Sequence, residues 1–484
     1  MKNLLVCLLL LCCGIPAVAQ DESAPIQIGG VSFSGSVRER YEVWDWFEPA
    51  TGQNQYGYSG TLIRLALSQQ RETFDWKLEF AVPVLLGIPD RAVQPAPAGQ
   101  LGLGGSYYAA NDKEQNTAFI FPKEAYVRFK DDNGSSLQAG RFEFTDGSEV
   151  KPKDPTLATL KNDRISQRLL GTFGFSDVMR SMDGLHYVLS NGSWNFTAVS
   201  AIPTRGVFQV DGWGWVKTPV TYVSVTKEYD QGEDQPHAEW RVFGIYYNDS
   251  RGIEKTDNRP ASVRALDLSA INLGTYGGHV IAALPTSGGT FDVLGWLALQ
   301  NGSWGTQSQR ASAFAGEAGF QPHVWESLRP WIRGGYFYSS GDGNPNDHTH
   351  STFFAILPTP RVYARFPFFN EMNNRDLFEE IMLRPGKNLT IRSDIHGLWL
   401  DNSHDLWYSG GGAFQPWTFG FQGRPSNGHT GLATLYDISG DYNFKHGISL
   451  GLYFGYAVGG DVIKAIYPRD SNGALGFTEF NYHF

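Results

Sequence analysis

Hydrophobic and polar residues alternate with a period of two along the first part of the chain. From residue 31 to residue 43 every second position is mostly apolar, and the positions between hold serine, arginine and glutamate. Residues 61–70 and 74–84 repeat the alternation. A period of two places the two sets on opposite faces of a β-strand. These strands are longer than the ~5–6 residues usual in soluble proteins. They match the ~9–11 residues that cross a bilayer as part of a β-barrel.

The connections between these segments are of two kinds. Asn191-Gly192 predicts a type I′ hairpin turn, whose two central residues both need positive φ, and Asn301-Gly302 predicts another. Short turns are also expected at residues 131–134 and 443–447. Long polar or glycine- and proline-rich connections occupy residues 87–117, 145–163, 231–236, 339–349 and 401–427. Short turns at one end and long loops at the other are typical of an outer-membrane barrel.

These patterns predict an all-β fold, a transmembrane antiparallel β-barrel with short periplasmic turns and long extracellular loops. Glycine accounts for 56 of 484 residues and aromatic residues for 14%, whereas charged residues make up only 18%, which argues against disorder. Beyond the N-terminus no stretch approaches the ~20 apolar residues of a transmembrane helix. No linker marks a second domain. Residues 31–484 are therefore expected to form one barrel, preceded by a short segment at residues 20–30.

Residues 1–19 have the features of a secretory signal peptide. Lys2 precedes an apolar region at residues 4–11, and Ala17-Val18-Ala19 predicts cleavage before Gln20. A lipoprotein is the alternative, although leucines and not small residues precede Cys12. All three cysteines lie inside this segment, so the exported chain is expected to have none. Loss of Lys2 changes the net charge from −10 to −11, which excludes nucleic acid as an expected partner.

The C-terminus ends in aromatic residues at alternate positions, Phe480, Tyr482 and Phe484. Such a strand is similar to the signal that the barrel-assembly machinery recognises, with its aromatic side chains facing lipid. We therefore predict that these three residues form a membrane-assembly signal. The predicted location is the outer membrane of a Gram-negative-type bacterium.

Motifs of catalysis are missing from the sequence. It has no G-x-S-x-G, H-E-x-x-H or G-x-x-x-x-G-K pattern, so no enzymatic activity, cofactor or metal is expected. Residues 342–347 begin like a calcium loop, but Asp347 replaces the required glycine and Phe353 stands where the bidentate glutamate belongs. We interpret this segment as a polar loop with solvated histidines, His348 and His350.

Cations recur on the polar faces of the predicted strands. A lysine or arginine that faces hydrocarbon at the midplane costs ~2–4 kcal/mol, so these side chains are predicted to line the lumen. The candidate pore-lining residues are Arg38, Arg40, Arg64, Lys77, Glu79, Arg128, Arg392 and Asp394. The residues predicted to face lipid are Phe33, Val37, Ile63, Leu65, Trp76 and Phe80.

Two interpretations of the lumen cations remain open. Guanidinium groups could form a ring that selects anions. Alternatively, barrel lumens are simply polar, and nearby carboxylates such as Glu42, Glu79, Glu124 and Asp394 neutralise the arginines.

One family resemblance adds to this picture. Residues 140–147, GRFEFTDG, are similar to the G-R-x-x-F-x-D-G turn of the alginate export family of outer-membrane proteins. Residues 338–347 and the later pairs Asn373-Asn374, Arg384-Pro385 and Trp407-Tyr408 also resemble that family. The resemblance spans roughly residues 31–484. It implies a monomeric barrel of about 18 strands, within a range of 16–18, and an arginine-lined pore for an anionic polysaccharide. It adds Arg141, which lies in a matching motif, to the candidate pore residues.

The functional hypothesis is an outer-membrane channel for an anionic polysaccharide or a small anionic solute. The alternative is a general or small-solute porin of the same fold, for sugars or organic acids. Less favoured are an outer-membrane enzyme and a soluble carbohydrate-binding β-protein. The expected partners are outer-membrane lipids, the transported solute, the barrel-assembly machinery and periplasmic export components.

Overall fold

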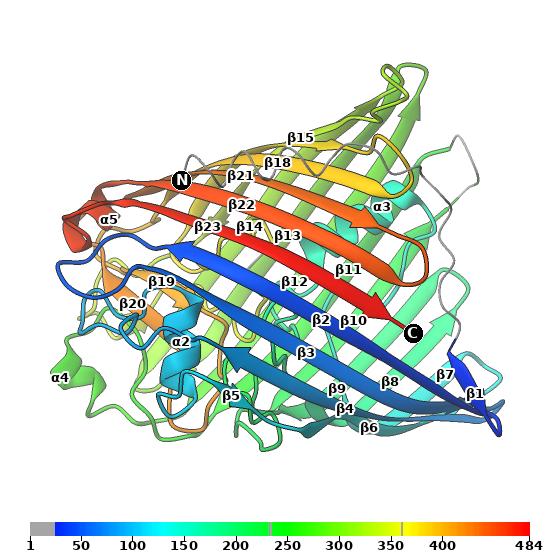
Figure 1. The fold of residues 1–484 in the computed structure, drawn as a ribbon, viewed down its shortest axis with the longest axis horizontal. Coiled ribbons are helices and arrows are strands. Elements are labelled where there is room, and N and C mark those ends of the chain that lie inside the picture. The colour runs from blue at the N-terminus through cyan, green and yellow to red at the C-terminus, as the bar shows by residue number, and fades with distance from the viewer. Residues whose placement is uncertain (1–24, 231, 233–234, 360–361) are drawn as a thin grey trace.

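The chain forms a closed barrel of 18 antiparallel strands (Figure 1). The structure is a computed structural model that describes residues 25–230, 232, 235–359 and 362–484. The first barrel strand pairs with the last, which closes the sheet. The fold predicted from the alternation is therefore confirmed. The predicted signal peptide and its cleavage site lie outside the described residues.

The barrel strands are β2 (Val31–Asp45), β3 (Gln55–Gln70), β4 (Phe74–Leu86), β6 (Phe121–Lys130), β7 (Ser135–Phe142), β8 (Met182–Asn191), β9 (Trp194–Pro203), β10 (Val220–Tyr229), β11 (His237–Asp249), β12 (Ile271–Thr286), β13 (Gly289–Trp304), β14 (Gln307–Pro322), β15 (Trp331–Ser339), β17 (Arg375–Leu383), β18 (Leu389–Trp399), β21 (Gly431–Asn443), β22 (Ile448–Gly459) and β23 (Asn472–His483). The short strands are β1 (Ile26–Ile28), β5 (Thr117–Ala118), β16 (Thr349–His350) and the hairpin β19 (Leu406–Gly410) with β20 (Phe421–Pro425). The helices are α2 (Leu103–Ala110), α3 (Pro155–Leu160), the π-helix η1 (Lys161–Ile165), α4 (Ala261–Arg264) and α5 (Asp461–Ile466). None of the described helices has the length and apolar character needed to cross a membrane.

The strand faces follow the predicted alternation in β2, β3 and β4. Leu65 and Phe80 lie opposite each other on the outer face and are each 40% exposed, whereas Glu79 on the inner face is 4% exposed. One carboxylate, that of Glu39, shares the outer face with Val37. It accepts hydrogen bonds from the hydroxyls of Ser59 and Thr61 on the neighbouring strand.

Two predicted turns differ from those observed. The hairpin at Asn191-Gly192 is present, but its turn residues are Gly192 and Ser193, and of these only Gly192 has positive φ. Glycine first in the turn fits type II′ and not type I′. The prediction at Asn301-Gly302 is wrong, because both residues lie inside β13 and the chain turns after Trp304.

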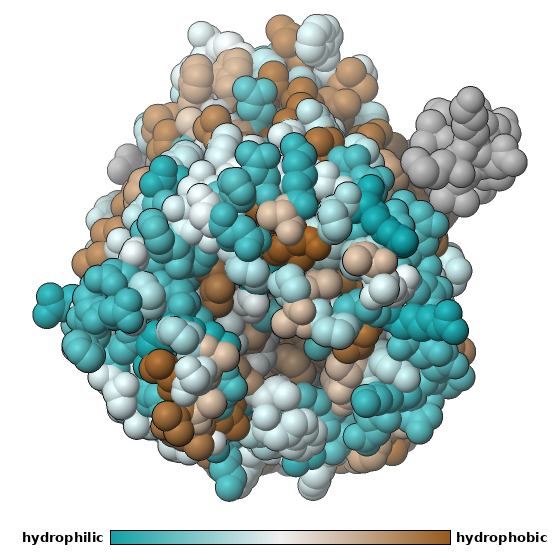
Figure 2. Space-filling view, turned by 90° about the vertical axis from the view of Figure 1, so that its left-hand side faces the viewer, coloured by the Kyte–Doolittle hydropathy of each residue, from teal (hydrophilic) through white to brown (hydrophobic). Residues whose placement is uncertain are grey.

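The loops are divided between the two ends largely as predicted. Residues 231–236 are an exception, since they connect β10 to β11 at the end with short turns. The other end carries the long connections, which include α2, α4, α5 and the β19–β20 hairpin (Figure 1). Because outer-membrane barrels have short periplasmic turns, the end with short turns is the periplasmic one. Figure 2 looks onto the opposite, extracellular end, which is mostly hydrophilic around a central hollow.

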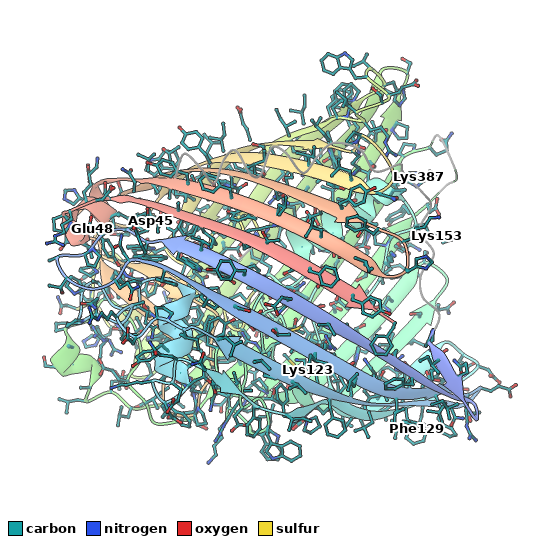
Figure 3. All side chains as sticks on the ribbon, in the orientation of Figure 1. Asp45, Glu48, Lys123, Phe129, Lys153 and Lys387 are labelled. Carbon is teal, nitrogen blue, oxygen red and sulfur yellow. The ribbon has the colours of Figure 1, made fainter. Side chains whose placement is uncertain are left out.

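A long segment between β7 and β8 fills the lumen. This plug segment (residues 143–181) contains α3 and η1 and contacts inner-face side chains of β2, β11, β14 and β17. It reaches the periplasmic end, where Lys153 lies 3.9 Å from Asp230 at the end of β10. Figure 3 shows Lys153 near that end, on the same side as Lys387 and opposite Asp45 and Glu48. The lumen is therefore a packed interior and not an open pore.

A second inward segment packs against the plug. The backbone of Leu357 bonds to the plug residues Leu169 and Gly171, and the Phe354 ring packs edge-on against Trp304 of the barrel wall. This second inward segment comprises residues 351–359 and 362–372. Its apolar residues and those of the plug form two hydrophobic clusters with the inner faces of the strands.

Candidate functional site

The guanidinium groups of β2 hold the plug. Arg38 donates to the backbone carbonyls of Gly174, at 2.6 Å, and of Ser176, and lies 3.4 Å from the carboxylate of Asp177. Arg40 lies 3.8 Å from the same carboxylate and donates to the backbone carbonyl of Phe175. Both arginines face the lumen, as the alternation requires. They fasten the plug to the wall.

The cations of β3 and β4 are paired with carboxylates. Arg64 pairs with Glu79 and lies 3.2 Å from Glu143 at the start of the plug. Lys77 pairs with Glu79 at 2.7 Å and also with Glu124 of β6. Each of these positive charges therefore has at least two negative neighbours.

A second charged group lies across the lumen on β17 and β18. Arg392 pairs with Glu380 at 2.7 Å and with Asp394 at 2.9 Å. Arg164 of the plug reaches Glu380 at 2.5 Å. The five cations Arg38, Arg40, Arg64, Lys77 and Arg392 thus all have carboxylate partners, which favours the interpretation of a neutralised wall at these positions.

Arg128 differs from these five. It donates to the amide oxygen of Gln138 at 2.7 and 2.9 Å, and its guanidinium lies 5.5 Å from the Tyr126 ring centre. Among the described residues, no carboxylate lies within ion-pair distance of it. Its positive charge on the inner face is uncompensated.

Arg141 does not face the lumen, contrary to the prediction. It lies between Gly140 and the buried Phe142 on the outer face of β7, where it pairs with Asp183 at 2.7 Å. The indole of Trp213 covers its guanidinium at 5.2 Å. The position of a residue in a family motif does not tell on which face of the strand its side chain lies. The alternation along residues 137–142 would have placed Arg141 on the outer face.

Other residues of that motif stabilise the plug. Asp146 is fully buried and accepts hydrogen bonds from the backbone N–H groups of Leu169 and Leu170. Arg241 of β11 lies 3.5 Å from its second oxygen. The motif therefore marks the place where the plug segment turns into the lumen.

A cavity of about 310 Å³ opens on the extracellular side of the plug. Its lining includes indole rings, amide side chains, three cations and one carboxylate: Trp44, Trp46, Gln100, Gln415, Gln422, Lys255, Arg264, Arg424 and Glu254. The carboxylate of Glu254 is paired with Arg264 at 3.2 Å. The indole N–H of Trp46 is buried and has no hydrogen-bond partner within the described part of the chain. Aromatic faces beside amides and a cation are suited to a carboxylated saccharide.

Arg424 supplies uncompensated charge to this cavity. Its donors are bonded to neutral acceptors, among them the carbonyls of Ala98 at 3.1 Å and Gln100 at 2.7 Å, and its guanidinium lies 4.8 Å from the Trp407 ring. Arg180 of the plug likewise donates to the backbone carbonyls of Gly411 and Ala413. Neither arginine has a carboxylate within ion-pair distance in the ranges that the structure describes.

An ion pair joins the plug to the second inward segment. Arg168 lies 3.4 Å from Glu371, and the Trp296 ring lies 4.6 Å from the guanidinium. Burial raises the pKa of the Glu371 carboxyl to about 7, although the charge of Arg168 opposes the shift. Neither oxygen of Glu371 has a hydrogen-bond donor among the described residues.

The predicted solvated loop is partly buried. His350 is fully buried, its ring stacks on Trp304 at 4.2 Å, and its Nδ1 lies 2.6 Å from the side-chain oxygen of Gln309. The prediction of a solvated histidine is therefore wrong for His350. In the adjacent loop, Asp342 accepts a hydrogen bond from the backbone of Asn344.

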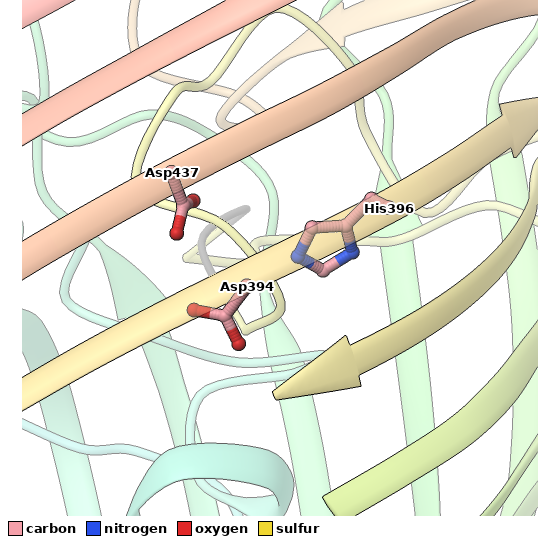
Figure 4. A group of neighbouring side chains, drawn as sticks. All are labelled: Asp394, His396 and Asp437. Atoms are coloured by element: carbon pink, nitrogen blue, oxygen red, sulfur yellow. The ribbon is translucent and has the colours of Figure 1, made fainter. Parts of the chain in front are cut away.

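One group of possible metal ligands occurs in the described structure: Asp394, His396 and Asp437 (Figure 4). The alternation predicts Asp394 in the lumen, but it gives no sign that Asp437 lies next to it. Only the register of β18 against β21 brings these two carboxylates face to face. No short motif contains that information.

The C-terminal residue lies against the start of the barrel. Phe484 exchanges two backbone hydrogen bonds with Gly35, at 2.9 and 3.0 Å, and its ring lies 5.7 Å from that of Phe33. A Cβ atom at Gly35 would lie 2.5 Å from the Phe484 ring, so the glycine makes room for it. Phe480 and Tyr482 are exposed on the outer face.

The closed barrel with its charged, loop-filled lumen defines an outer-membrane channel of the porin class. A family model described as alginate export matches residues 30–477, and the chain belongs to the alginate export family. Its location is accordingly the outer membrane. No curated protein sequence matches the chain.

Solved structures similar to this barrel are outer-membrane proteins with very different sequences. Acinetobacter baumannii OccAB2 matches with a TM-score of 0.56 and 9% identity, over 94% of this chain and 98% of that one. Pseudomonas aeruginosa OpdK matches with a TM-score of 0.52 and 7% identity, over 94% and 99%. A structure of OpdK with vanillate matches with a TM-score of 0.52 and 8% identity, over 93% and 98%. At such identities the similarity shows the fold.

Proposed function

We propose that the protein is a channel for an anionic saccharide, of the uronate class that the name of its family indicates. Selection of the anionic solute rests on three cations that have no carboxylate partner among the described residues. These are Arg424 and Arg180 near the extracellular mouth and Arg128 on the wall. The arginines of β2 and β3 instead hold the plug in place, and Arg392 of β18 pairs with carboxylates of the wall. This differs from a pore lined throughout by free arginines.

The cavity at the extracellular side of the plug carries this proposal. Arg424 brings a positive charge to a lining of indoles and amides in which the carboxylate of Glu254 is already paired with Arg264, and the buried Trp46 N–H has no hydrogen-bond partner in the described part of the chain. A guanidinium in a site of low polarity attracts a carboxylate more strongly than it would in water. The vanillate in the OpdK structure, an aromatic carboxylate, is a precedent on the same fold for an anionic solute.

The neutralised wall supports a second candidate, a general or small-solute porin. With five lumen cations paired, the central part of the path has little net positive potential. On this account the channel passes sugars and organic acids with weak preference for anions. In either case we infer transport and not catalysis.

The remaining parts of the proposal concern assembly. We infer that the signal peptide is cleaved before Gln20 and that the barrel-assembly machinery recognises Phe480, Tyr482 and Phe484. We further infer a monomer in outer-membrane lipid that receives or delivers its solute with periplasmic export components.

Channel recordings with oligosaccharides test the function. The purified protein is inserted into planar bilayers, and block of the current is compared between alginate-derived oligouronates and neutral oligosaccharides of equal length. We expect block by the oligouronates at a concentration at least about 10-fold lower, which corresponds to about 1.4 kcal/mol of charge-dependent attraction. Arg424→Gln should remove most of this difference, and Arg424→Lys should keep part of it.

Arg141→Gln is the matched control, because Arg141 lies on the outer face. It should leave block and reversal potential as they are in the parent protein. Equal block by acidic and neutral oligosaccharides would contradict the proposal and support the general porin.

A further inference from the structure

Two aspartates lie directly opposite each other on the inner face of the barrel wall. Asp394 of β18 pairs in register with Asp437 of β21, and the two are 3% and 7% exposed. Like charges directly opposite each other in an antiparallel pair destabilise a sheet. Burial increases the repulsion, so this pair needs a compensating positive charge.

The surrounding arginines compensate only part of this charge. Arg392 pairs with both Glu380 and Asp394, and Arg164 lies 4.0 Å from Asp394. Asp437 accepts a hydrogen bond from the Tyr453 hydroxyl at 3.2 Å and has no ion pair among the described residues. Counting Asp376, four carboxylates face two guanidinium groups here, a deficit of two positive charges.

His396 completes the group. It follows Asp394 by two residues in β18, so both side chains project from the same face. The imidazole is fully buried, and its Nδ1 lies 3.0 Å from the carboxylate of Asp376. Its Nε2 is buried without a hydrogen-bond partner in the described part of the chain. Figure 4 shows one ring nitrogen turned toward Asp394 and Asp437.

We propose that Asp394, His396 and Asp437 bind a divalent transition-metal ion of the Zn²⁺ class. One ligand atom from each residue lies within 4.8 Å of the other two. Tetrahedral ligands at ~2.1 Å from zinc are about 3.4 Å apart, so small side-chain rotations complete the site. One imidazole and two carboxylates suit such an ion, whereas Ca²⁺ and Mg²⁺ prefer oxygen ligands alone.

The contact between His396 and Asp376 belongs to this site. Metal-binding histidines usually donate their second ring N–H to a carboxylate, which fixes the tautomer and directs the other nitrogen to the metal. Here the Nδ1–H of His396 donates to Asp376, so Nε2 is the nitrogen left for the ion. The two positive charges of the ion balance the deficit of two positive charges around these carboxylates.

The site is open to a cavity. Asp394 and Asp437 line a space of about 190 Å³ between the wall and the plug, together with Asn162 and Asp163 of the plug. A fourth coordination position can therefore hold water or an anionic group from a solute. The ion also links two adjacent barrel strands, because Asp394 and His396 belong to β18 and Asp437 belongs to β21.

Metal titration of the folded barrel tests the proposal. Protein purified in detergent is stripped with a chelator and titrated with Zn²⁺ by calorimetry, and with Co²⁺ by visible absorption. We expect one equivalent to bind. His396→Gln and Asp437→Asn should each weaken binding by more than about 10-fold, and Asp376→Asn by about 10- to 100-fold.

His279→Gln is the matched control. His279 is also buried on the inner face with one ring nitrogen 2.8 Å from a carboxylate oxygen, that of Glu239, but it does not belong to the group of possible metal ligands. Binding should remain in this variant. Absence of Zn²⁺ binding to the parent protein, as expected if His396 is instead protonated on both nitrogens, overturns the proposal. Equal binding to the parent and His396→Gln also overturns it.

Cu²⁺ paramagnetic resonance of the parent protein tests the site if the variants do not assemble. The proposal requires hyperfine structure from one imidazole nitrogen in the spectrum of the tightly bound ion. A spectrum with oxygen ligands alone overturns it.

Discussion

The ion pairs between β2 and the plug lead to a direct prediction about the conductance of the channel. Asp177 is fully buried and lies 3.4 Å from Arg38 and 3.8 Å from Arg40. Asp177→Asn keeps the size of the side chain and removes its charge. Loss of one partner from a buried ion pair costs about 3–5 kcal/mol. The lower value applies here, because Arg40 keeps Glu42 and Glu479.

A loss of about 3 kcal/mol raises the ratio of displaced to docked plug roughly 100-fold. Single-channel recordings in planar bilayers should therefore show more frequent and larger openings for Asp177→Asn than for the parent protein. Gly60→Ala provides an independent perturbation, because its Cβ would lie 2.2 Å from the Asp177 carboxylate and push the plug away from the neighbouring strand β3, where Gly60 pairs with Arg40.

Asp183→Asn is the control, since Asp183 pairs with Arg141 on the outer face and, among the described residues, has no ion pair with the plug. It should leave the recordings unchanged. If Asp177→Asn and Gly60→Ala both assemble and conduct like the parent protein, the β2 arginines do not hold the plug, and the reasoning is refuted.

Three further predictions concern orientation, pH and assembly. With cysteines introduced singly, a water-soluble thiol reagent should modify position 64 and spare position 65 in membranes, and the reverse pattern would require Arg64 and Leu65 to exchange faces. Because burial raises the pKa of Glu371 from 4.5 to about 7, the folded chain binds its proton more tightly than the unfolded chain. Its contribution to stability should be full at low pH and fall by up to about 3 kcal/mol between pH 4.5 and 7. The difference in urea unfolding between the parent and Glu371→Gln should therefore change across that interval, and a constant difference would contradict the pKa. Deletion of Phe484 should lower the amount of protein in the outer membrane, and normal levels on immunoblots of membrane fractions would exclude an assembly role.

The barrel could be predicted from the sequence because its signal is local. Alternation along β2, β3 and β4 reports which side chains face inward, so Arg38, Arg64 and Glu79 were placed on the correct face. The same rule applied to residues 137–142 would have placed Arg141 outside, and the family motif was the weaker guide. Asn301-Gly302 failed as a turn because β13 continues two residues past Gly302, to Trp304, paired along its length with β12 and β14.

The contents of the lumen could not be predicted in this way. The plug joins segments distant in sequence, such as Arg164 with Glu380 and Arg38 with Ser176. Loops carry no periodic pattern that reports whether they fold outward or inward. Whether a lumen cation is free or paired depends on those contacts, and the sequence analysis accordingly left both interpretations open.

Arg40 has a consequence for the closure of the barrel. Its guanidinium bonds to Glu479 of β23, across the line where the first and last strands meet, and to the carbonyl of Phe175 in the plug. The pairing of the first strand with the last and the docking of the plug thus both involve this one side chain. A barrel that closed before the plug entered would leave the Arg40 guanidinium in water, without its bond to Phe175 and without the Phe175 ring that covers it at 3.6 Å. Closure of the strand pair β2–β23 and docking of the plug are therefore coupled through this one guanidinium, which contacts both.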